Sequence, residues 1–75
     1  MEGLYFSAPV DDERTLCLAP MTDRRLSMAA QDVPDTSGYF LYELIGTGET
    51  ARVEIIARVI SDEAIHRLRE MLRLD

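Results

Sequence analysis

The sequence predicts an α+β fold: a small, mainly antiparallel β-sheet of four or five strands, with one C-terminal helix packed on one face. Two observations predict it. Residues 4–60 contain short stretches in which apolar and polar residues alternate, separated by turn-forming residues. Residues 62–73 instead carry apolar residues at the helical period. At 75 residues, the chain is expected to form one domain, residues 1–75.

Three short strands are expected in the N-terminal half. Leu4–Ala8 is rich in β-forming residues and ends before Pro9, and Arg14–Ala19 alternates in polarity until Pro20. The third is Arg25–Ala30, which also alternates. Because methionine and alanine favour helix, a helical turn is the alternative for this third segment.

Gln31–Gly38 is predicted to be a surface loop, because Asp32, Pro34 and Gly38 are turn formers. Loops often carry function, so this segment is the first place to expect a binding site. The two adjacent arginines upstream could hold an anion through bidentate hydrogen bonds. The candidate ligand-binding residues are therefore Arg24, Arg25, Asp35 and Ser37.

Residues 39–60 are predicted to form a β-hairpin around a two-residue turn at Gly48 and Glu49, since glycine in the first position suits a type II′ turn. This register pairs Tyr42 with Ile55 and gives one face only apolar residues. The C-terminal helix is expected to cover that face, which carries Phe40, Tyr42, Leu44, Val53, Ile55 and Ala57.

The opposite face of the hairpin is also rich in apolar residues, although one short helix cannot cover two faces. Leu41 opposite Ile56 forms its expected centre, and Glu43 opposite Glu54 is an unfavourable pair that Arg52 and Arg58 could relieve. We expect a second copy of the chain to cover this face, which predicts a homodimer. Closure of the sheet into a small barrel is the alternative. The expected interface residues are Tyr39, Leu41, Ile45, Ile56, Arg58 and Ile60.

The C-terminal helix is predicted from Asp62 to Arg73. Ser61 is a favourable N-cap, and the acidic residues that follow it suit the positive end of the helix dipole. The apolar stripe expected to be buried consists of Ala64, Ile65, Leu68, Met71 and Leu72.

Composition excludes several functional classes. Fourteen acidic residues against eight basic ones give a formal net charge of −6, which disfavours nucleic acid and anionic membranes as partners. No apolar run is long enough to span a bilayer. Lysine and asparagine are absent, as expected for a GC-rich bacterial genome. One cysteine and no export signal predict a cytoplasmic protein.

Residues with catalytic potential are few. His66 is the one histidine, and it falls on the polar side of the predicted helix. Cys17 lies in an alternating strand, where a half-buried structural thiol is expected. Gly46 and Gly48 could suggest a phosphate-binding loop. That motif, however, requires a lysine, which is absent here, and a following helix, whereas a strand is predicted to follow. We therefore expect no enzyme, no catalytic or metal-binding residue and no cofactor.

Two functions remain as hypotheses from the sequence. The first is a small protein-interaction or regulatory domain that acts by self-association or by binding another protein. The second is an anion-binding module that uses Arg24, Arg25 and the loop at residues 31–38.

Overall fold

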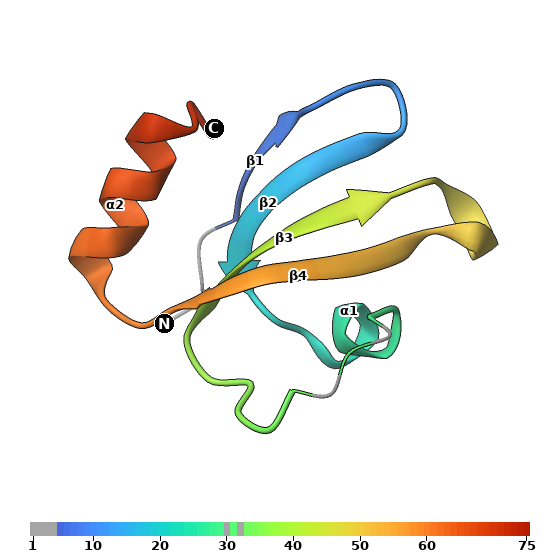
Figure 1. Ribbon diagram of the computed structural model, residues 1–75, viewed down its shortest axis with the longest axis horizontal. Coiled ribbons are helices and arrows are strands. Elements are labelled where there is room, and N and C mark those ends of the chain that lie inside the picture. Colours follow the sequence, from blue (N-terminus) through green and yellow to red (C-terminus); the bar gives the residue numbers. More distant parts are fainter. Residues whose placement is uncertain (1–4, 30, 32) are drawn as a thin grey trace.

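The predicted fold class is confirmed by the computed structural model, which describes residues 5–29, 31 and 33–75. The strands form one antiparallel sheet in the order β1-β2-β3-β4, and the last helix follows β4 directly (Figure 1). Within the described residues, the elements are β1 (Phe6–Pro9), β2 (Arg14–Pro20), α1 (Asp23–Ser27), β3 (Tyr39–Ile45), β4 (Arg52–Val59) and α2 (Asp62–Met71).

The first two predicted strands are present, whereas the prediction of a third strand before the loop is wrong. Its first three residues, Arg25–Ser27, belong to α1, in line with the helical alternative. Thr22 caps α1, because the Thr22 hydroxyl accepts a hydrogen bond from the Arg25 N–H at 3.2 Å. Leu4, Ala30 and Asp32, which the sequence assigned to strands and a loop, lie outside the described residues.

The hairpin between β3 and β4 has the predicted register near its turn, where Tyr42 pairs with Ile55. The turn itself differs from the prediction: a short 3-10 helix at Gly48–Thr50 replaces the two-residue turn. Beyond Tyr42 the register shifts by one residue: Leu41 pairs with Ala57, and Ile56 has no partner on β3. Ile56 is thus the extra residue of a β-bulge.

The bulge exchanges the faces of the last part of β4. Side chains alternate along a strand, so an extra residue moves every later side chain to the other face. Val59 therefore packs with Phe6 and Leu18 rather than with Val53. The predicted pairing of Leu41 with Ile56 and of Tyr39 with Arg58 is wrong for this reason, since Tyr39 pairs with Val59.

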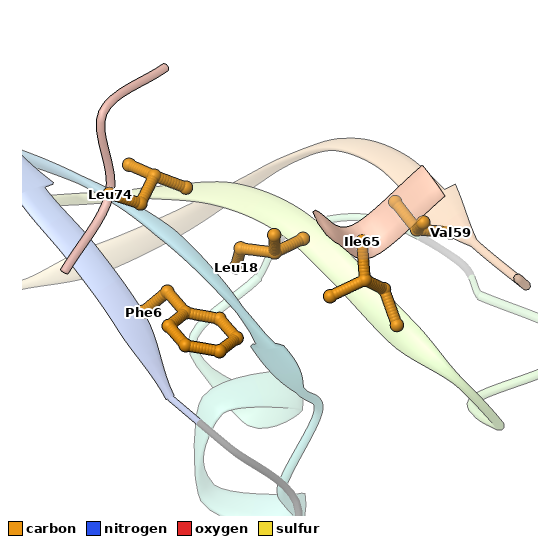
Figure 2. Packing of buried hydrophobic residues seen from close by; sticks show 5 residues of the cluster. All are labelled: Phe6, Leu18, Val59, Ile65 and Leu74. Carbon is orange, nitrogen blue, oxygen red and sulfur yellow. The ribbon is translucent and has the colours of Figure 1, made fainter. Parts of the chain in front are cut away.

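Two hydrophobic clusters lie on the two faces of the sheet. The helix face packs against α2 (Figure 2), and the loop face packs against residues that flank α1 and begin the following loop. The helix-face cluster consists of Phe6, Leu18, Val59, Ile65 and Leu74. The loop-face cluster consists of Cys17, Ala19, Phe40, Tyr42 and Val53, with Met21, Met28, Ala29 and Val33 against it.

The prediction that α2 covers the face of Phe40 and Tyr42 is wrong, because α2 lies on the opposite face, over Leu18. Both faces are apolar, so either one could accept the helix. Residues that adjoin α1 already cover the loop face, and the bulge places Val59 on the helix face just before α2 begins. Tyr39 and Leu41, expected at an interface, therefore pack against the helix-face cluster.

The end of α2 turns the chain into the core. Arg73 has a φ of 54°, the Leu74 N–H donates to the Arg69 carbonyl at 2.9 Å, and the Arg73 N–H donates to the Glu70 carbonyl at 3.3 Å. This is a Schellman motif, and it buries Leu74. Met71 is 76% exposed, so the predicted buried stripe ends one turn early.

Both edges of the sheet are partly covered by the chain itself. At β1, the Ser7 N–H donates to the Asp75 carbonyl at 2.9 Å, and the Asp75 N–H donates to the Ser7 carbonyl at 3.1 Å. At β4, the Val53 N–H donates to the Met28 carbonyl at 3.1 Å. These contacts remove part of the unpaired backbone that would otherwise attract another strand.

Candidate functional site

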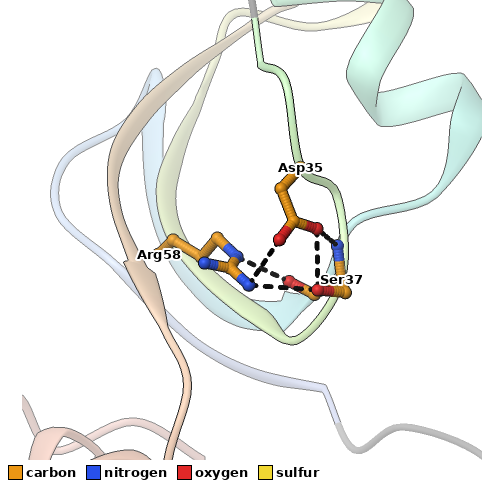
Figure 3. A network of polar contacts seen from close by, with 3 residues as sticks. All are labelled: Asp35, Ser37 and Arg58. Carbon is orange, nitrogen blue, oxygen red and sulfur yellow. Dashed lines mark hydrogen bonds and ion pairs between the residues drawn. The ribbon is translucent and has the colours of Figure 1, made fainter.

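The loop after α1 is tied to the outer strand β4 by Arg58, a predicted interface residue. Figure 3 shows its guanidinium facing Asp35 and Ser37. Arg58 Nη2 lies 2.9 Å from Asp35 Oδ2 and 3.0 Å from Ser37 Oγ, and Arg58 Nε donates to the Ser37 carbonyl at 2.9 Å. Ser37 in turn donates to Asp35 Oδ1 through its N–H and its hydroxyl, at 3.0 and 2.7 Å. These contacts fasten residues 35–37 of the loop to β4.

These hydrogen bonds stabilise the charged form of Asp35. The backbone N–H of Ser37 and then its hydroxyl lower the pKa of the Asp35 carboxyl, and the Arg58 charge adds to the effect. Asp35 and Ser37 were predicted to line a ligand site in which Arg24 and Arg25 hold an anion. In this arrangement, Asp35 is itself the anion that Arg58 and Ser37 bind.

Gln31 continues the protection of the β4 edge. Its side-chain amide makes the two hydrogen bonds that the backbone of a neighbouring strand would make. The Ile55 N–H donates to Gln31 Oε1 at 2.7 Å, and Gln31 Nε2 donates to the Ile55 carbonyl at 3.3 Å. The two residues are 24 positions apart in the sequence. No local pattern indicates this contact, which explains why sequence reasoning missed it.

A cleft of about 360 Å³ lies between the loop and β4. Its apolar residues come from both elements, and the side chains of Asp35 and Arg58 stand beside them, bonded to each other. Ile56, at the bulge, is 55% exposed, and Ile60 is 76% exposed. The lining residues are Gln31, Val33, Pro34, Asp35, Phe40, Ile55, Ile56 and Arg58. Val33 and Pro34 are apolar loop residues that the sequence could have flagged.

The predicted interface is therefore not one patch. Tyr39 and Leu41 lie under α2, whereas Ile56 and Arg58 lie on the exposed part of β4 from the bulge onward, and Ile60 directly follows the strand. Ile45 sits at the other end of the hairpin, paired with Arg52 on β4 and with Arg14 on β2.

Glu43 and Glu54 are paired as predicted, and their charges act on Arg14, an arginine that the prediction did not include. The pKa of Arg14 is raised chiefly by its hydrogen bond to Asp11, and further by the charges of the two glutamates. Arg14 thus offsets part of the repulsion between them.

The predicted anion site is divided into two. Arg24 and Arg25 line a cleft of about 680 Å³ with the β3–β4 turn, while Asp35 and Ser37 face Arg58. The reason is the helical conformation of α1. α1 lies beside the turn, so both arginines line the cleft there and do not continue as a strand towards the loop.

His66 and Cys17 occupy different environments. His66 is exposed, as predicted, in an open cleft of about 610 Å³ that Arg69, Glu70 and Arg73 also line. Cys17 is completely buried rather than half-buried, and its Sγ lies 3.2 Å from the Tyr5 hydroxyl.

The part of the chain that the structure describes contains no group of three His, Cys, Asp or Glu side chains placed to hold a metal ion. It also contains no helix with the length and apolar character needed to cross a membrane.

The chain matches no family model, no curated protein and no solved structure in the comparisons made.

Proposed function

We propose that the protein is a small interaction domain that acts by binding another protein chain, most simply a second copy of itself. The binding surface is the β4 surface, defined as Ile56, Ile60, Arg58 and the cleft beside them. The observation that carries the proposal is the exposure of two large β-branched residues, 55% and 76%, at the end of an outer strand.

The composition of the β4 surface supports protein binding. Ile56 adjoins apolar residues of the cleft, including Val33 and Pro34, so the patch extends beyond a single side chain. Contiguous apolar surface of this kind is typical of interaction sites. Arg58 and Asp35 stand at its border with their charges paired, which gives the polar rim common at such interfaces.

The size of the domain favours association. A chain of 75 residues buries only about 60% of its unfolded surface on folding and has limited stability alone. Its one cysteine cannot form an intrachain disulfide. Oligomerisation is then a physically reasonable source of added stability.

The test is the molar mass in solution, measured by light scattering after size exclusion from low to high micromolar concentration. We expect the wild-type chain to run as a dimer. Ile56→Asp should give a folded monomer, because a carboxylate in an apolar interface carries a desolvation cost without a partner.

Val10→Asp is the matched control. Val10 is 49% exposed in the turn between β1 and β2, so the substitution adds the same charge away from the β4 surface. It should leave the dimer intact. A wild-type monomer at every concentration would overturn self-association, and equal loss of the dimer in both variants would overturn the location of the interface.

A further inference from the structure

The cleft between α1 and the β3–β4 turn has the features of an anion site. We propose that it binds a small molecule carrying a phosphate group, with Arg24 and Arg25 as the residues that hold the phosphate. The site does not involve the β4 surface, so it goes beyond the interaction proposed above. We call it the arginine cleft, and its lining residues are Arg24, Arg25, Leu44, Gly46, Thr47, Gly48 and Ala51.

The first relevant feature of the arginine cleft is its charge. Arg14 and Arg58 form ion pairs with Asp11 and Asp35 at 2.8 and 2.9 Å. Among the described residues, neither Arg24 nor Arg25 forms such a pair. In a chain with a net charge of −6, two adjacent arginines that face one cleft without a carboxylate partner keep their full capacity to bind an anion.

The second feature is the fixed backbone of the segment that carries the two arginines. Besides the Thr22 cap, the Met28 N–H donates to the Arg25 carbonyl at 3.1 Å and closes the other end of α1. The Met28 carbonyl accepts from the Val53 N–H on β4 at 3.1 Å, which ties α1 to the sheet. The backbone that carries both guanidinium groups is therefore held in place before any ligand arrives, which lowers the entropic cost of binding.

The third feature is the wall of the cleft opposite the arginines, which is formed by the β3–β4 turn. Gly46 and Gly48 have φ angles of 82° and 64°, a region that favours glycine. A Cβ added to Gly48 would have no neighbour within 4 Å, so the space at this glycine is open. The Gly46 N–H donates to the Glu13 carbonyl at 2.8 Å and anchors the turn. A ligand can thus approach the backbone closely.

The chemistry of two guanidinium groups favours phosphate over carboxylate. One guanidinium can satisfy a carboxylate, which has two oxygens and one negative charge. A phosphate monoester has three terminal oxygens and a charge between about −1.5 and −2 at neutral pH, so it can engage both arginines. The volume of about 680 Å³ is within the usual range for small-molecule sites.

The experiment is a titration of the ¹⁵N-labelled full chain with inorganic pyrophosphate, with phosphate and acetate in parallel, followed by amide chemical shifts at low ionic strength. We expect saturable shifts in residues 22–28 and 46–51. Arg24→Ala and Arg25→Ala should each weaken pyrophosphate binding tenfold or more. Lysine at either position should restore part of the affinity, because the charge returns without the bidentate geometry.

Arg67→Ala is the matched control, because Arg67 is an exposed arginine on α2 and its loss changes the net charge equally. Its affinity for pyrophosphate should equal that of the wild type. The absence of saturable shifts, or equal weakening by Arg67→Ala, would overturn the site. Acetate binding as tightly as pyrophosphate would overturn the phosphate assignment. The wild-type oligomeric state does not enter this readout, so the two proposals fail independently.

Discussion

Arg58 on β4 and Asp35 in the loop are joined by an ion pair of 2.9 Å across 23 positions of the sequence. The pair has a structural role: with Ser37, it fastens the loop against β4 and shapes the cleft next to Ile56. Asp35 and Arg58 therefore line this cleft as a bonded pair rather than as two free charges.

The hydrogen bonds from Ser37 to Asp35, with a smaller contribution from the charge of Arg58, make stability depend on pH at the acid end. The pKa of Asp35 is lowered by the Ser37 N–H and hydroxyl and by Arg58, so the carboxylate binds protons less readily when folded. Its stabilising contribution is therefore present above about pH 4, the ordinary aspartate value, and is lost as the pH falls through the folded pKa. NMR titration of the Asp35 carboxyl should show Ser37→Ala and Arg58→Gln each raising that pKa. Arg67→Gln, on α2, should leave it unchanged; a shift there would contradict the local origin.

The Gln31 amide should control local opening of the β4 edge. Gln31→Ala removes both hydrogen bonds to Ile55 and is expected to cost about 0.5–1.5 kcal/mol of unfolding free energy. Hydrogen exchange at the Ile55 amide should accelerate. Gln31→Glu keeps the acceptor for the Ile55 N–H and loses only the donor, so its exchange rate should be intermediate. Unchanged exchange in the alanine variant would mean that Gln31 does not cover this edge in solution.

The end of α2 offers a stabilising substitution. Arg73 adopts a left-handed conformation that disfavours side chains, and glycine relieves this cost. Arg73→Gly should raise the unfolding free energy by about 0.5–1 kcal/mol in urea denaturation. Arg67→Gly makes the same exchange inside the helix and should lower stability by about 1 kcal/mol. Destabilisation by Arg73→Gly would show that the Schellman turn is absent.

The core position of α2 can be tested by truncation. Ile65 is buried among Phe6, Leu18 and Val59, so Ile65→Ala should cost about 2–5 kcal/mol. Met71→Ala should change stability by less than about 0.5 kcal/mol, because Met71 is 76% exposed. Leu68→Ala should fall between them, since Leu68 is only partly buried. Equal losses at Ile65 and Met71, measured by chemical denaturation, would place a different face of α2 on the sheet.

The raised pKa of Tyr42 predicts that the folded protein loses stability at alkaline pH. Burial, with a smaller effect from Cys17, raises the pKa of Tyr42 to about 12, so the fold favours the neutral phenol. This contribution is fully present below about pH 10, the ordinary tyrosine value, and is lost as the pH rises towards 12. Tyrosinate absorbance should show a late-titrating group that disappears in Tyr42→Phe, whereas the pKa of Tyr5, which burial also raises, should still be detected in that variant. The same variant should lose less stability than the wild type between pH 10 and 12.

Local patterns in the sequence were sufficient for the elements whose signals are short in range. The alternation of apolar and polar residues predicted β2 and β3, and the position of the glycines in the turn predicted the register from Ile45 to Tyr42. Ser61 marked the start of α2, and its hydroxyl accepts the Ala64 N–H at 3.1 Å. The helical alternative for α1 followed from residue preferences. Each of these features depends on neighbours within a few positions, which a sequence displays directly.

Only the tertiary structure decided how the candidate site was assembled. The bulge at Ile56 places Val59 on the opposite face from Val53, whereas an uninterrupted period of two places both on one face, so that period assigned the end of β4 to the wrong face. The contacts of Gln31 with Ile55 and of Asp35 with Arg58 join positions more than 20 residues apart. Both sheet faces were apolar, and periodicity gave no means of choosing which one α2 would cover. Packing of the residues around α1 made that choice, because a hydrophobic face already covered has no further area to remove from water.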